Sequence, residues 1–110
     1  MGVTAYLVAE NLTPVTGLGD PALDGTFDAA GDFDRLIPAF DDTSFVCWRL
    51  IDPYDNTVFT AGQIPAFLEE LNRLLPQARQ GPELNGMLRL RALARLVIQG
   101  RDLSLLLAGD

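Results

Sequence analysis

Residues 45–60, FVCWRLIDPYDNTVFT, decide the fold of this chain of 110 residues. An apolar run rich in aromatic and β-branched residues meets DPYDN at residues 52–56, and a second short apolar run follows. Aromatic and β-branched side chains favour a pleated surface, whereas Pro, Asp and Asn favour chain reversal. The stretch therefore predicts a β-hairpin, and it contains the single Trp and the single Cys of the chain.

The first arm of this hairpin would alternate between two faces of a sheet. If Arg49 faces water, the opposite set points to the core: Val46, Trp48 and Leu50. The set that shares the face of Arg49 is also apolar: Phe45, Cys47 and Ile51. We expect the segment around Leu18, Leu23 and Phe27 to cover this second face. The alternative is that a partner protein covers it.

The sequence before the hairpin predicts little regular structure. Residues 3–9, VTAYLVA, are typical of a strand. Residues 13–31 are interrupted by Gly and Pro and indicate a long surface loop. Residues 32–40 predict one helical turn, with Asp32 as its N-cap and Pro38 as its end.

The sequence after the hairpin predicts two helices and a strand. Apolar residues recur at helical spacing over 64–75 and again over 83–99, with Pro65 and Pro82 near the two starts. LSLLLA at 103–108 predicts a last strand apolar enough for the interior of a sheet. We therefore expect one α+β domain over residues 1–110, with an antiparallel sheet of about four strands and both long helices packed on one face.

The charge of the chain is unevenly distributed. Residues 1–60 hold ten acids and two Arg, a net charge of −8, whereas residues 61–110 hold five acids and six Arg, a net charge of +1. This balance disfavours nucleic acid and anionic membrane surfaces as partners and favours a basic protein.

Other features of the composition indicate where the protein works. Every basic residue is Arg, which suggests GC-rich coding and a bacterial source. The N-terminal sequence lacks the basic region and cleavage site of a secretory signal, and a lone Cys47 within an apolar run is typical of a buried thiol in a reducing compartment. We expect a cytoplasmic protein.

Two groups of acidic residues are candidate sites. Asp20, Asp24, Asp28 and Asp32 are spaced by four, but Pro21 and Gly25 argue against a continuous helix, and the stretch lacks the terminal Glu of an EF-hand. We interpret this group as a solvated loop or as a binding surface for a basic partner, with Asp24, Asp28 and Asp32 as its candidate residues. Metal binding is the least favoured interpretation of this group, and we expect neither a metal nor a cofactor.

The second group lies at the hairpin tip, where Asp52, Tyr54 and Asp55 are candidate binding residues. Paired carboxylates perform acid–base chemistry when burial separates their pKa values, yet Asp at a turn also has a purely structural use. The chain has no His to activate Ser44 or Cys47, so we expect no catalytic residue. Three hypotheses remain: a non-enzymatic acidic binding module, a small enzyme or ligand-binding protein that uses the tip, and a self-associating subunit such as a homodimer.

The second half of the chain resembles a family of small uncharacterised bacterial proteins. The similarity covers residues 45–110 and lies in DPYDNTVF at 52–59, in Gln63, in the Leu- and Glu-rich helix pair and in the final Gly109-Asp110. The family has DPYGDTVFN, so this chain departs from it at Asp55-Asn56 and at Thr60. The resemblance implies a helix pair followed by a closing strand and implies no reaction. Some acidic bacterial proteins of this size are immunity partners of secreted toxins, which by analogy suggests such a role here.

Overall fold

The computed structural model describes residues 3–9, 33–100 and 102–109. Within them lies an antiparallel sheet of three strands in the order β1-β3-β2: β1 (Val3–Val8), β2 (Asn56–Thr60) and β3 (Ser104–Gly109). The expected α+β class is confirmed, with three strands in this part of the chain rather than about four. The interior position expected for the last strand is also confirmed, because β3 pairs with β1 on one side and β2 on the other.

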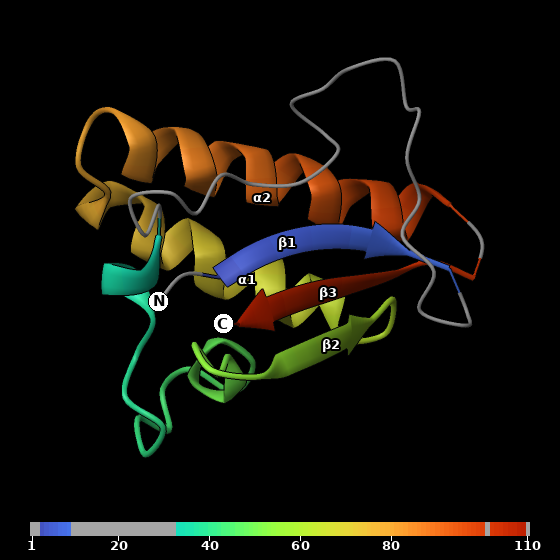
Figure 1. Cartoon of the computed structure of the whole chain (residues 1–110), viewed down its shortest axis with the longest axis horizontal. Helices are drawn as coiled ribbons and strands as arrows, with labels where there is room; N and C mark the ends of the chain where they lie inside the picture. The colour runs from blue at the N-terminus through green and yellow to red at the C-terminus, as the bar shows by residue number, and fades with distance from the viewer. Residues whose placement is uncertain (1–2, 10–32, 101, 110) are drawn as a thin grey trace.

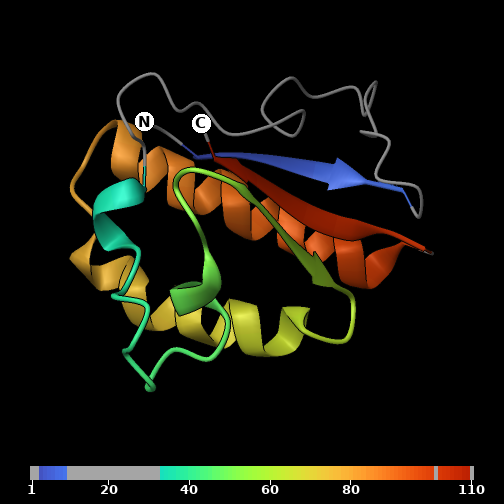
Figure 2. The same ribbon diagram turned by 60° about the horizontal axis from the view of Figure 1, so that its bottom comes forward.

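Both long helices lie on one face of the sheet: in Figure 1 α1 is seen behind the strands and α2 above β1, and in Figure 2 both lie below β1. They are α1 (Ile64–Leu74) and α2 (Pro82–Gln99), whose ends agree with the sequence prediction to within one residue. The apolar stripe of α1 is buried as expected from its spacing, at Ile64, Phe67, Leu71 and Leu74. Gly81 has a φ of 102°, which glycine adopts readily, and it turns the chain into Pro82 at the start of α2.

The first arm of the predicted hairpin is not a strand. Residues 45–51 form turns and a short 3₁₀ helix (Trp48–Leu50), and β2 pairs with β3 instead. The expected alternation is wrong as well: Cys47, Trp48 and Ile51 are buried, whereas Val46 is 62% exposed and Leu50 40%. Arg49, expected in open water, is half-buried. A spacing of three between Trp48 and Ile51 suits a helical turn, which the two-residue period of a strand does not.

Four aromatic rings join the segments of the core. Trp48 stacks on Phe67 of α1 with ring centres 5.2 Å apart, and Phe67 also contacts Phe59 of β2 at 5.1 Å. Phe33 meets the Trp48 ring edge-on at 6.0 Å. The core thereby fixes the chain before β2 against both the sheet and α1.

Residues 33–40 run along the outside of this core. The expected helical turn is a 3₁₀ turn (Asp34–Leu36) that begins after Phe33 and ends before Pro38. Its Arg35 makes a two-pronged ion pair with Glu83 at the start of α2, at 2.6 and 3.0 Å. The predicted cap Asp32 and the predicted loop over 13–31 lie outside the described residues. No helix in the described part of the chain is both long and apolar enough to cross a membrane.

Candidate functional site

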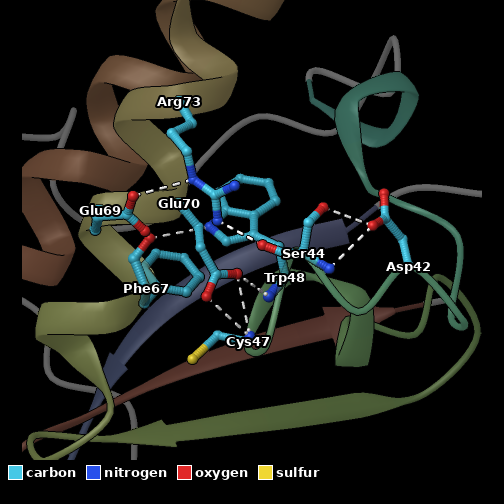
Figure 3. Close-up of polar contacts among 8 residues, drawn as sticks. All are labelled: Asp42, Ser44, Cys47, Trp48, Phe67, Glu69, Glu70 and Arg73. Carbon is cyan, nitrogen blue, oxygen red and sulfur yellow. Dashed lines mark hydrogen bonds and ion pairs between the residues drawn. The ribbon is translucent and has the colours of Figure 1, made fainter.

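A buried carboxylate attaches the Trp48 segment to α1 (Figure 3). Glu70 is only 2% exposed, and its oxygens accept backbone N–H bonds from Cys47 at 3.1 and 3.2 Å and from Trp48 at 3.0 Å. These N–H groups begin the 3₁₀ helix, where backbone donors have no partner within the helix. The Trp48 indole N–H donates to the Phe67 carbonyl at 3.1 Å. Together these bonds hold the segment on α1.

A second, exposed set of contacts lies beside this one (Figure 3). Arg73 of α1 donates to the Ser44 carbonyl at 2.6 Å, lies 4.4 Å from the centre of the Phe45 ring, and pairs with Glu69 at 3.0 Å, as its i,i+4 spacing predicts. The Ser44 hydroxyl and backbone N–H both donate to Asp42. These two bonds, with a smaller effect of Arg73, lower the pKa of Asp42. The carboxylate therefore keeps its charge at neutral pH.

Cys47 is enclosed from the α1 side. Its thiol lies 3.8 Å from the Gln63 carbonyl, and burial, followed by the nearby Glu70 carboxylate, raises its pKa. The buried thiol expected from the sequence is confirmed, but Cys47 and Ile51 do not form part of an apolar second sheet face. The proposed cover around Leu18, Leu23 and Phe27 lies outside the described residues.

The turn at residues 52–55, which the sequence predicted as a hairpin tip and which we still call the tip, is fastened to β3. Asp52 accepts the Tyr54 backbone N–H at 2.8 Å, and Gly109 donates its N–H to the Asp55 carbonyl at 2.9 Å. A β-carbon on Gly109 would stand 2.4 Å from the Asp52 carbonyl oxygen and 2.5 Å from the Pro53 carbonyl carbon. Only glycine allows the strand to pass this close to the tip.

Between this tip and residues 34–40 the surface is hollowed into a groove of about 500 Å³, which we call the 34–54 groove. Its volume is in the range of small-molecule and peptide-side-chain sites. Ten residues from two stretches of the chain line it: Asp34, Ile37, Pro38, Phe40, Arg49, Leu50, Ile51, Asp52, Pro53 and Tyr54. Three of them are apolar and exposed, namely Phe40 at 72%, Tyr54 at 66% and Leu50 at 40%. Exposed apolar and aromatic side chains gathered around one concavity are typical of a binding surface.

Arg49 is the basic residue among these ten. It donates to the Phe40 carbonyl at 3.0 Å, and its guanidinium lies 5.7 Å from the centre of the Phe40 ring. Its Nε is buried and finds no acceptor among the described residues. A buried donor without a partner is uncommon in folded proteins and costs about 1–3 kcal/mol.

The groove contains two of the six residues that the sequence identified as candidates. Asp52 and Tyr54 line it, whereas Asp55 lies beyond the lining and accepts the Asn56 backbone N–H at 2.7 Å. Asp24, Asp28 and Asp32 lie outside the described residues. Sequence reasoning missed Phe40, Arg49 and Leu50 as lining residues. The strand predicted over 45–51 placed Leu50 in the core, and nothing in the sequence indicated that residues 34–40 face the turn at 52–55.

The groups that line the groove determine which contacts it can offer. Asp52 and Asp55 are both exposed, and each accepts a backbone N–H close to it in sequence, as Asp residues in turns do. Among the described residues no group of three or more Cys, Asp or Glu side chains is placed to hold a metal ion. Exposed rings, carboxylates and an arginine provide stacking, ion pairing and hydrogen bonding to a ligand.

Comparisons with known proteins add no relative: no family model, no curated protein and no solved structure matches the chain.

Proposed function

We propose that the chain is a non-enzymatic protein-binding module that engages a basic partner protein through the 34–54 groove. The observation that carries this proposal is the exposure of Phe40, Leu50 and Tyr54 around one groove that also contains Asp34 and Asp52. Exposed aromatic side chains grouped in a concavity supply binding energy at protein interfaces, and the surrounding charge selects the partner.

The charges near the groove favour a basic partner. Residues 33–60 hold five acids against two Arg, and one of these, Arg35, is already paired with Glu83. Opposite charges accelerate the encounter of two proteins. Salt screens this attraction, with a Debye length of about 8 Å at physiological ionic strength. A narrower form of the proposal is an immunity-type role, in which the partner is a basic secreted toxin of a bacterium.

A photo-crosslinking experiment tests the proposal. A phenylalanine analogue that crosslinks under light replaces Tyr54 in the groove, and in a matched control it replaces Ile98, which is 51% exposed on α2. We expect a basic protein to be crosslinked in native cells from position 54 and not from position 98. The purified pair should then lose at least about tenfold in affinity between low and high salt.

Three results would contradict the proposal: equal crosslinking from both positions, no crosslinking from position 54, or an affinity that does not change with salt. A crosslink to a second copy of the chain would favour the self-associating subunit instead.

The alternative of a small enzyme or ligand-binding protein has one observation in its favour, the groove beside the tip. It has weaker chemical support, because Asp52, Tyr54 and Asp55 are exposed and no His is present to share proton transfer. A small ligand that protects the protein against thermal unfolding, and loses that effect in Asp52→Asn, would support it.

A further inference from the structure

Resting on the proposed function, we further propose that the 34–54 groove recognises an arginine of the partner. The guanidinium would stack on Tyr54 and pair with Asp52.

The protein already contains this kind of contact within its own chain. Arg73 combines an aromatic face, a carboxylate and a backbone carbonyl, at 4.4 Å from the Phe45 ring centre, 3.0 Å from Glu69 and 2.6 Å from the Ser44 carbonyl. Tyr54 and Asp52 offer the first two of these groups in the groove, and the ring is 66% exposed. The planar guanidinium suits both the ring face and the two carboxylate oxygens, whereas an ammonium lacks this fork.

Charge argues against an anionic occupant. The lining contains two carboxylates and one guanidinium, so an anionic ligand would gain Arg49 but meet Asp34 and Asp52. A cationic group fits the groove better.

Selection from a random peptide-display library on the purified protein tests the inference. We expect enriched sequences to share an Arg, and the corresponding free peptides to bind about tenfold more weakly to Asp52→Asn and to Tyr54→Ala. Asp52→Asn keeps an oxygen that can accept the Tyr54 N–H and removes only the charge. Ile98→Ala, on α2, should bind like the native protein, and replacing the peptide Arg by Lys should weaken binding several-fold.

Enrichment of acidic or neutral peptides, equal binding to the groove variants, or no enrichment at all would overturn the inference. The proposed function would survive these results if position 54 still crosslinked a basic protein. Both would fail if no partner were found at that position.

Discussion

At the scale of single residues, one carboxylate sets the path of the chain through the core. Glu70 accepts the backbone N–H groups of both Cys47 and Trp48 at the beginning of a 3₁₀ helix. Such donors would otherwise be buried without partners, because the residues around them are buried. The same bonds direct Trp48 onto Phe67 and leave Arg49 and Leu50 on the groove side of the segment.

We predict that Glu70→Gln lowers the free energy of unfolding by about 1–3 kcal/mol, because the amide keeps one acceptor oxygen and turns a donor towards N–H groups. Glu69→Gln, at the exposed neighbouring position, should cost less than about 1 kcal/mol. Chemical denaturation followed by Trp fluorescence measures both, since Trp48 is the only Trp. Equal losses of unfolding free energy in the two variants would show that the buried hydrogen bonds of Glu70 do not contribute to stability.

The Arg35–Glu83 pair makes a prediction about pH. The hydrogen bonds from Arg35 lower the pKa of Glu83, with a smaller effect of the Arg79 backbone N–H. A carboxyl whose pKa is lower in the folded state stabilises the fold above its unfolded value of about 4.3 and loses that effect as pH falls through the folded value. Glu83→Gln should therefore cost up to about 1 kcal/mol at pH 7, and the difference from the native protein should vanish in acid.

Denaturation of the native protein and Glu83→Gln over a pH series measures this difference. Arg35→Gln serves as the matched partner, and combining the two substitutions should add little to either alone. A difference that stays constant from neutral to acid pH would rule out the ion pair as its source.

At the scale of elements, the sequence predicted those whose signal is local. Both helices carry regular apolar spacing and a Pro near the start, so their ends could be placed to within a residue. The prediction of a strand over 45–51 was wrong because contacts with a residue distant in sequence, Glu70, outweigh the strand-forming composition of this segment. A Glu three residues after Phe67 and four before Leu74 lies on the buried stripe of α1, and this position was the one sequence signal for that contact.

The groove was predictable on one side only. The turn chemistry of residues 52–56 identified Asp52 and Tyr54 at the tip, because Asp and Pro act on their immediate neighbours. The opposite wall, from Ile37 to Phe40, meets the tip through tertiary packing, and the local sequence carries no information about that contact.

The junction of the tip with β3 gives a prediction at this scale. Gly109→Ala would place a methyl group 2.4 Å from the Asp52 carbonyl oxygen, so the tip or the strand end must move. We expect a loss of about 1–3 kcal/mol in stability and faster hydrogen exchange at amide 109, which loses its bond to the Asp55 carbonyl. Gly62→Ala is the control, because the nearest atom to its added carbon would be the Thr60 hydroxyl at 4.0 Å. Similar effects of the two substitutions would contradict this account of the junction.

At the scale of the whole molecule, the acidic part of the sequence is the part that forms the groove. The groove belongs entirely to the acidic first 60 residues, while the less charged remainder supplies both long helices and the central strand. Arg35 with Glu83, and Arg73 with the Ser44 carbonyl, join the two parts. The second half therefore acts as the scaffold that holds the acidic groove in shape.

The order of the sheet gives the last prediction. β1 and β2 do not pair with each other, since each is bonded to β3 on opposite sides. Deleting Ser104–Gly109 would remove the buried Leu105 and Leu107 and leave both remaining strands without a neighbour, and an isolated strand is not stable in water. We expect this deletion to abolish cooperative unfolding and to expose Trp48, seen as a red-shifted emission. Leu106→Thr, which changes a half-buried side chain on the face away from Leu105 and Leu107, should keep the transition. A cooperative transition in the deleted chain would mean that the helices and the Trp48 core fold without the sheet.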